Sequence, residues 1–167
     1  RTFSLAESDD EFLVSATRRY VHTVTIPAAP EHVWAALTAA DALVSFSPFV
    51  TGMRWLTSSP RGVGSVRIVT LVGAVALTER FYRWDEQRRM TFTVSAASIP
   101  GLRRFAEDVL LEPVGSATRL TWTFALEGQS PVRPLLWLGS PLSQRVTASI
   151  ANGVTRRALD VAAGTSR

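Results

Sequence analysis

Hydrophobic and polar residues alternate along most of the chain, and this period of two predicts seven strands. Two short helical segments follow the first strand, and a long one closes the chain. The links between the last six strands are short and rich in Gly, Pro, Ser and Asp, so we expect antiparallel neighbours. The predicted strands are Tyr20–Ile26, Val50–Leu56, Ser65–Val72, Ala74–Trp84, Arg89–Ala97, Leu102–Glu112 and Thr118–Glu127.

Helical spacing replaces strand spacing in three places. Pro30 and Glu31 suit the first turn of a short helix, which tolerates the proline ring and favours negative charge. Asp41 can cap a second short helix that ends at Phe46. The third segment, Pro141–Ala163, repeats apolar residues at steps of three and four, which predicts one long helix with one buried stripe. The stripe is Leu142, Val146, Ile150, Val154, Ala158 and Val161.

This order of elements predicts an α+β fold in which a curved seven-stranded antiparallel sheet grips the long C-terminal helix. Residues 20–164 are predicted to form a single domain, and residues 1–19 an arm of undetermined structure. Gly153 lies in the middle of the long helix, where glycine costs about 1 kcal/mol relative to alanine. Close packing against a neighbour or open space between helix and sheet would each explain this glycine. Open space would provide a ligand cavity.

Three charged residues, Arg67, Glu79 and Glu107, lie on strand faces that are otherwise apolar. If these faces line the interior, an arginine and two carboxylates point into one apolar space. Burying an unpaired ion costs several kcal/mol, so these groups must pair, hold water or meet a ligand. A purely structural ion pair at the open end of the sheet is the alternative. Their apolar neighbours are Val69 and Leu71, then Val75, Leu77 and Phe81, then Phe105, Val109 and Leu111.

Composition limits the possible functions. A chain of 167 residues with 46% hydrophobic and 19% charged residues can bury one sizeable core. No apolar run approaches the roughly 18 residues that a membrane span needs, and the chain does not open like a signal peptide. We therefore expect a cytoplasmic protein without a transmembrane segment. The absence of cysteine excludes disulfides, thiolate nucleophiles and cysteine metal sites.

The charged and catalytic residue types exclude further classes. All 18 basic residues are arginine, and the four adjacent arginine pairs are scattered along the chain, which argues against nucleic-acid binding. The absence of lysine excludes Schiff-base and P-loop chemistry. His22 and His32 lack metal-ligand spacing, and neither G-x-S-x-G nor H-E-x-x-H occurs. We expect no metal, no other cofactor and no nucleophile-based hydrolase.

Four short motifs carry a resemblance that extends over about residues 20–163. They are Pro30-Glu31-His32-Val33-Trp34, Gly62-Val63-Gly64-Ser65-Val66-Arg67, Thr78-Glu79-Arg80 and Thr118-Arg119-Leu120-Thr121-Trp122. Together they resemble the START-like (SRPBCC) superfamily, and within it the polyketide cyclase/dehydrase branch. The resemblance implies the helix-grip fold around an apolar pocket for lipids, polyketides, sterols or hormones.

The same resemblance implies roles for particular residues. Arg67 and Glu79 fall where plant abscisic-acid receptors of this superfamily place polar pocket residues. Arg67 also falls near a pocket arginine that is thought to orient the poly-β-keto chain in aromatase/cyclases. Those receptors anchor the ligand carboxylate with a lysine, whereas the matching position here is near Ser47.

Three functions are compatible with these observations. The first is binding of a hydrophobic small molecule, oriented by Arg67, Glu79 and Glu107. The second is a polyketide cyclase or dehydratase, in which Arg67 stabilises an enolate oxygen and Glu79 or Glu107, with a pKa raised by burial, moves the proton. The third is a co-chaperone or stress-type interaction protein, with Pro134–Leu138 as a docking patch.

The first function defines a predicted site and partner. The partner is a hydrophobic small molecule and not a nucleic acid, bound by a monomer or a homodimer. The predicted pocket residues are Trp34, Phe46, Ser47, Arg67, Val69, Leu77, Glu79, Phe81, Phe92, Phe105, Glu107, Trp122, Ile150 and Val154.

Overall fold

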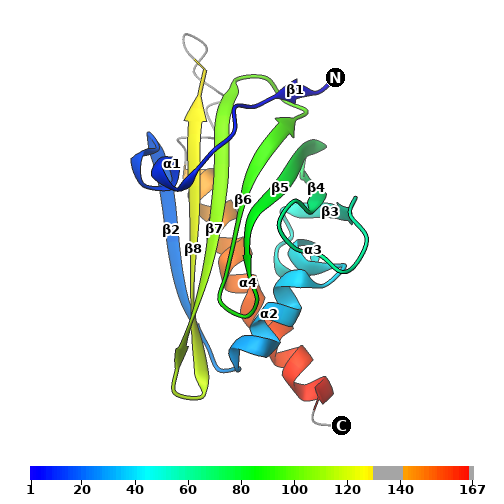
Figure 1. Cartoon of the computed structure of the whole chain (residues 1–167), viewed down its shortest axis with the longest axis vertical. Helices are drawn as coiled ribbons and strands as arrows, with labels where there is room; N and C mark the ends of the chain where they lie inside the picture. Colours follow the sequence, from blue (N-terminus) through cyan, green and yellow to red (C-terminus); the bar gives the residue numbers. More distant parts are fainter. Residues whose placement is uncertain (130–140, 166–167) are drawn as a thin grey trace.

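One curved antiparallel sheet wraps around a long helix in the computed structural model, which describes residues 1–129 and 141–165. The strand order is β2-β8-β7-β6-β5-β4-β3 (Figure 1). All seven predicted strands are present, each within two residues of its predicted ends, and the α+β helix-grip prediction is confirmed. The strands are β2 Arg18–Ile26, β3 Val50–Trp55, β4 Val66–Leu71, β5 Val75–Asp85, β6 Arg89–Ala97, β7 Leu102–Val114 and β8 Ala117–Gly128.

The helices occupy both faces of the sheet. α4 lies against the concave face and contacts α2, α3 and β2, whereas α1 contacts β7 and β8 on the opposite face (Figure 1). No helix within the described ranges is both long and apolar enough to cross a membrane. The helices are α1 Asp10–Ser15, α2 Pro30–Thr38, α3 Ala42–Phe46 and α4 Pro141–Thr165.

The N-terminal arm fills a gap in the sheet, which the sequence pattern does not predict. β6 pairs with β7 only over Arg89–Thr93. Beyond that point a short strand, β1 (Phe3–Ser4), takes the place of β7 beside β6. The backbone N–H of Leu5 donates to the Ser95 carbonyl at 2.9 Å, and that of Ala6 donates to the Arg103 carbonyl at 2.9 Å. The arm therefore links two strands that have separated.

The helix of the arm covers the convex face. Phe12 and Leu13 of α1 pack with alanines of β7 and β8 in a small second core. Ion pairs from Arg80 to Glu7 and from Arg83 to Asp10 hold the arm from the sheet side. α1 therefore buries part of the convex face of the sheet.

The inward faces of the strands agree with the predicted alternation except at one residue. Leu77, Glu79 and Phe81 are all buried, as expected. Strict alternation along β5 predicts that Trp84 lies on the opposite face, and this prediction is wrong. A register shift between Phe81 and Arg83 turns Trp84 inward, where its ring lies 5.4 Å from Trp34 and 5.1 Å from Phe81.

The buried stripe of α4 begins one residue later than predicted. Leu142 is 49% exposed, so it does not belong to the stripe, whereas Ser143 is only 3% exposed. Counting three, four and seven residues on from Ser143 gives Val146, Thr147 and Ile150, which share its face of the helix. A polar residue therefore opens the inward face of α4.

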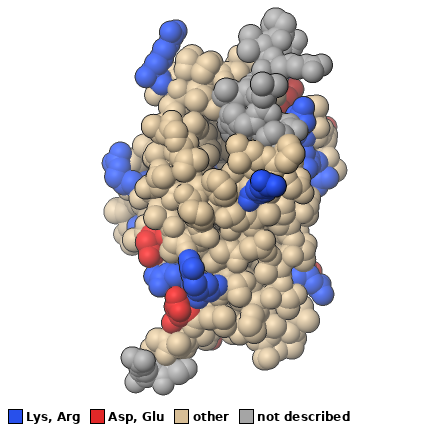
Figure 2. All heavy atoms as spheres, turned by 180° about the vertical axis from the view of Figure 1, so that it is seen from behind, with Lys and Arg blue, Asp and Glu red and all other residues tan. Residues whose placement is uncertain are grey.

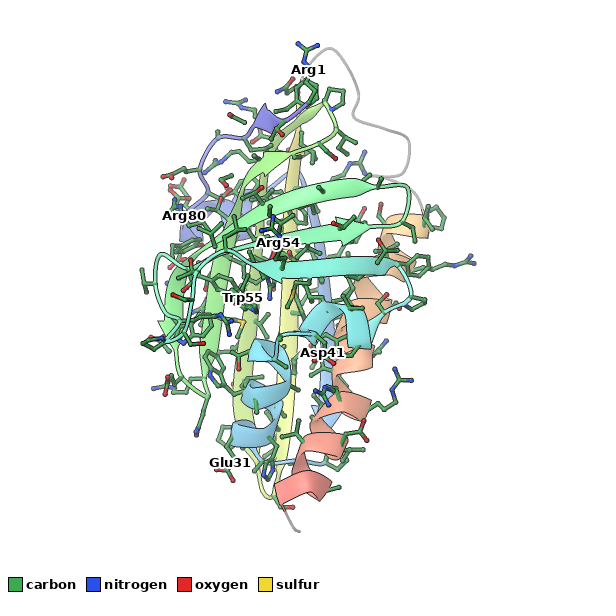
Figure 3. All side chains as sticks on the ribbon, turned by 90° about the vertical axis from the view of Figure 1, so that its right-hand side faces the viewer. Arg1, Glu31, Asp41, Arg54, Trp55 and Arg80 are labelled. Atoms are coloured by element: carbon green, nitrogen blue, oxygen red, sulfur yellow. The ribbon has the colours of Figure 1, made fainter. Side chains whose placement is uncertain are left out.

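Gly153 owes its presence to close packing. A Cβ at this position would lie 1.8 Å from the backbone oxygen of Phe46 in α3. Two further contacts join the same helices: the hydroxyls of Ser47 and Ser149 are 2.8 Å apart, and Arg156 Nη2 donates to the Ser45 carbonyl at 3.0 Å. Figure 3 shows α3, which directly follows the labelled Asp41, lying against α4. Close approach, not open space, is the explanation at this position.

Candidate ligand-binding site

An internal cavity lies between the concave face of the sheet and the N-terminal half of α4. The volume of this cavity is about 60 Å³. Most of the lining is aliphatic or aromatic, and five lining residues carry polar groups. The lining residues are Tyr20, Leu43, Val69, Leu71, Leu77, Glu79, Leu102, Phe105, Glu107, Phe124, Leu126, Ser143, Val146, Thr147 and Ile150.

A second apolar space adjoins the cavity on the side of the molecular surface. It offers about 110 Å³ and lies between α4, β3–β4 and the start of β5. Leu71 and Val146 line both spaces, so these two side chains form the boundary between them. Val72 and Leu142, which line only the outer space, are about half exposed. The outer space therefore lies between the cavity and exposed side chains at this point.

A buried ion pair lies on the sheet side of the cavity, between β4 and β5. The guanidinium of Arg67 donates from Nε to Glu79 Oε2 at 2.5 Å, and both side chains are 2% exposed. The two residues face each other directly across β4 and β5. Arg67 is also held by aromatic rings, since its Cζ lies 5.0 Å from the ring centroid of Phe81 and 4.8 Å from that of Phe92. The charge of Arg67 is thus balanced by Glu79 and covered by the aromatic rings.

Glu107 adds a second carboxyl group to this pair. Its Oε1 accepts a hydrogen bond from Trp122 Nε1 at 3.1 Å, and its side chain is also hydrogen-bonded to Glu79. Burial, followed by the charge of Glu79, raises the pKa of Glu107 well above its ordinary value. Two carboxyls in contact share one proton, and Arg67 balances the charge of Glu79. The raised pKa favours the protonated form of Glu107, and in that form the three groups together carry no net charge.

The opposite wall of the cavity contributes neutral polar groups from α4. Thr147 Oγ1 donates to the backbone carbonyl of Ser143 at 2.9 Å and lies 2.7 Å from His22 Nε2. Burial lowers the pKa of His22, which favours its neutral form. Both Ser143 and Thr147 line the cavity.

The structure places the fourteen predicted pocket residues in three groups. Arg67, Phe81, Phe92 and Trp34 lie in or beside the aromatic cluster, and Trp122 stacks on the lining residue Phe124. Phe46, Ser47 and Val154 belong to the core and contacts around α3 and α4. The other six line the cavity: Val69, Leu77, Glu79, Phe105, Glu107 and Ile150.

Nine lining residues were absent from the predicted set. Phe124 and Leu126 alternate with Trp122 on one face of β8, so strand periodicity could have found them. Ser143 and Thr147 share a helix face with Ile150, but their hydroxyls concealed them in a search for apolar positions. The remaining five are Tyr20, Leu43, Leu71, Leu102 and Val146.

Three further observations concern the charged surface, possible metal ligands and the predicted docking patch. Figure 2 shows basic side chains spread over the α4 side of the molecule, some beside acidic ones, with uncharged surface between them. Among residues 1–129 and 141–165, no three His, Asp or Glu side chains gather in a way that could hold a metal ion. The patch Pro134–Leu138, expected for an interaction protein, lies outside the described residues.

Comparison with known proteins agrees with this architecture. Residues 17–161 match the family model described as polyketide cyclase / dehydrase and lipid transport. An uncharacterized protein of Mycobacterium tuberculosis, Rv2574, is 30% identical over 131 residues, which cover 78% of each chain.

Solved structures show the same fold at lower identity. TTHA0849 from Thermus thermophilus superposes with a TM-score of 0.69 at 21% identity, covering 86% of this chain and 98% of that one. The Zhui aromatase/cyclase from Streptomyces sp. R1128 superposes with a TM-score of 0.67 at 19% identity, covering 85% of this chain and 93% of that one. The chain belongs to the family described as polyketide cyclase / dehydrase and lipid transport.

Proposed function

We propose that the chain binds an uncharged hydrophobic small molecule in the cavity between the sheet and α4. The observation that carries this proposal is the largely apolar cavity with the buried carboxyl group of Glu107 in its wall, where burial raises the pKa of that group. A carboxylic acid in such a place donates a hydrogen bond to an oxygen acceptor without burying a net charge. Apolar walls with a few polar groups are typical of small-molecule sites.

The charges of the site favour a neutral ligand over a carboxylate. Arg67 is already paired with Glu79, and none of the described lining residues is basic. A bound carboxylate would therefore lie near the negative charge of Glu79 without a cation to balance it. A ketone, ester or alcohol oxygen could instead accept the proton of Glu107.

The size of the cavity restricts how a ligand fits. About 60 Å³ is less than the roughly 150 Å³ of an engineered apolar cavity that binds benzene. A larger ligand can extend into the adjoining outer space if the side chains of Leu71 and Val146, which line both spaces, move apart. We therefore place the ligand across the boundary between the two spaces, with its oxygen at Glu107.

An NMR titration with two probes of equal chain length tests this proposal. 1-Octanol is expected to bind, and octanoate is expected to bind at least about tenfold more weakly, because its charge has no partner. Val146→Trp fills the boundary and serves as the blocked control, in which 1-octanol binding should be lost. Equal or tighter binding of octanoate, or no binding of 1-octanol, would contradict the proposal.

Catalysis of a cyclase or dehydratase type is a second candidate, favoured by the contact between Glu107 and Glu79 at the cavity. Glu107 would protonate a carbonyl oxygen while Glu79 accepts the proton lost from the neighbouring carbon. Arg67 does not line the cavity, so the enolate-stabilising role predicted for it has no support in this geometry. Deuterium exchange into 2-octanone in D₂O separates the candidates: a catalyst accelerates exchange beside the carbonyl, and a binding protein does not.

A further inference from the structure

One hydroxyl group in the cavity wall has no hydrogen-bond partner among the described residues. Ser143 is 3% exposed, lines the cavity, and its Oγ is buried without a partner. Buried side-chain hydroxyls are nearly always paired, because leaving one unpaired costs about 1–3 kcal/mol. An unpaired hydroxyl at a cavity therefore requires an explanation.

The neighbouring polar groups are already satisfied, which leaves Ser143 as the free group on this wall. Thr147 Oγ1 donates to a backbone carbonyl of its own helix, Ser143 at 2.9 Å or Gln144 at 3.2 Å. Its oxygen can then accept from His22 Nε2 at 2.7 Å. Neither Thr147 nor His22 needs a ligand, whereas Ser143 can both donate and accept.

Ser143 and the acid pair reach the cavity from different elements. Ser143 comes from the first turn of α4, Glu79 from β5 and Glu107 from β7. Between them the lining is apolar, with Phe105 and Ile150 among its residues. The two polar groups therefore bound one apolar space on two sides.

We propose that Ser143 is a second polar anchor, so that the ligand is an uncharged hydrophobic molecule with an oxygen function at each of two separated positions. A diol or a hydroxyketone has this character. One oxygen accepts from Glu107, and the other exchanges a hydrogen bond with Ser143 Oγ. This inference rests on the proposed function and narrows its ligand class.

Matched alcohols test the second anchor directly. The probes are diols from hexane-1,6-diol to decane-1,10-diol, each compared by NMR titration with the 1-alkanol of the same length. Because the best diol length is found by experiment, no span between the anchors has to be assumed. At that length the diol should bind about threefold to tenfold more tightly than the 1-alkanol, the gain of one net hydrogen bond.

Two serine variants on the same helix assign this gain. Ser143→Ala should abolish the preference for the diol over the 1-alkanol of the same length. Ser149→Ala is the matched control, since its hydroxyl contacts Ser47 and does not line the cavity. That variant should keep the preference. Ser143→Ala should also unfold at the same or a higher denaturant concentration than wild type, because it removes an unsatisfied hydroxyl.

The outcomes separate this inference from the proposed function. If no alcohol binds, both are wrong. If 1-alkanols bind but no diol is preferred, or if Ser143→Ala keeps the preference, the second anchor is wrong and the proposed function stands. A clear loss of stability in Ser143→Ala would also overturn the inference, because it would show that the hydroxyl has a structural partner in the unliganded protein.

Discussion

The two halves of α4 meet the rest of the molecule in opposite ways. The C-terminal half is packed without space: Gly153 lies against the backbone of α3, and Val154 and Ala158 are fully buried. The N-terminal half instead faces the cavity through Ser143 and Thr147. Gly153 thus allows close contact between α4 and α3, whereas polar and larger side chains of α4 border the cavity. Gly153 therefore marks a close contact between helices and not the cavity.

The sheet shows the same division. The ring of Phe81 lies 4.8 Å from that of Phe92 and 5.1 Å from that of Trp84, and these rings fill one part of the concave face. The other part, around Val69 and Leu77, leaves the cavity. The ion pair between Arg67 and Glu79 joins the two parts, because the arginine lies among the aromatic rings and the carboxylate lines the cavity. The aromatic rings therefore stabilise the charge of Arg67, and the carboxylate of Glu79 that it pairs with faces the cavity.

The largest predicted effect comes from breaking that junction. Arg67→Met leaves the Glu79 carboxylate buried without its cation, and we expect a loss of about 3–5 kcal/mol in the free energy of unfolding. Denaturant unfolding measures this loss. The double variant Arg67→Met/Glu79→Leu removes both charges and should recover most of it. If Arg67→Met loses less unfolding free energy than the double variant, the buried Glu79 carboxylate does not depend on Arg67 for its stability.

Packing at the tight half of α4 gives the next effect. Gly153→Ala places a methyl group against Phe46 and should cost about 2 kcal/mol, because α3 must move away from α4. Gly164→Ala is the matched control: it lies in the same helix, and nothing is within 4 Å of its added Cβ. That change should be neutral or slightly stabilising, since alanine favours helix. Equal stability of the two variants in thermal unfolding would refute the contrast.

Sequence periodicity predicted the parts of the fold that depend on regular alternation. Seven strands, two short helices and the long helix follow from it, as does the burial of Glu79 and Glu107. The arm could not be predicted in this way. β1 has only two residues and exists because β6 and β7 separate, and α1 is stabilised by contacts of Phe12 and Leu13 with the sheet. Both depend on tertiary contacts, which local patterns do not contain.

The candidate site was predictable only in its charged residues. Arg67 and Glu79 stand out because ions on apolar strand faces are rare, yet their pairing depends on the register between β4 and β5. Ser143 gave no signal, since serine near the start of a helix is ordinary and the expected stripe began at Leu142. The register shift at Trp84 likewise depends on an irregularity that alternation assumes absent. The sequence indicated individual residues of the site but not their relative positions.

The raised pKa of Glu107 predicts a specific dependence of stability on pH. The folded chain holds a proton that the unfolded chain releases once the pH exceeds the ordinary pKa near 4.5. The free energy of unfolding therefore falls as pH rises from that value to the raised pKa, by up to about 1.4 kcal/mol per pH unit from this group. Glu107→Gln keeps the polar shape without the titration, so the variant should lack this part of the decline.

Denaturant unfolding between about pH 5 and 8 compares the two chains. The control is Glu112→Gln on the same strand, where the carboxylate is half exposed and lies 3.9 Å from Arg119 at the surface. It should leave the slope as in wild type. If wild type and Glu107→Gln change in parallel over this range, Glu107 is not the group that holds the proton.

The smallest predicted effect distinguishes hollow from packed core by adding one methylene group to each. Val69 lines the cavity, so Val69→Leu can extend into free space and should change stability by less than about 1 kcal/mol, in the stabilising direction if the fit is good. Val109 is fully buried and does not line the cavity, so Val109→Leu should cost about 1–3 kcal/mol. Because the new methylene of Val69→Leu occupies the space proposed for the ligand, 1-octanol should also bind that variant more weakly. Similar losses of stability in both variants would mean that the cavity closes around its lining and that no room is held open for a ligand.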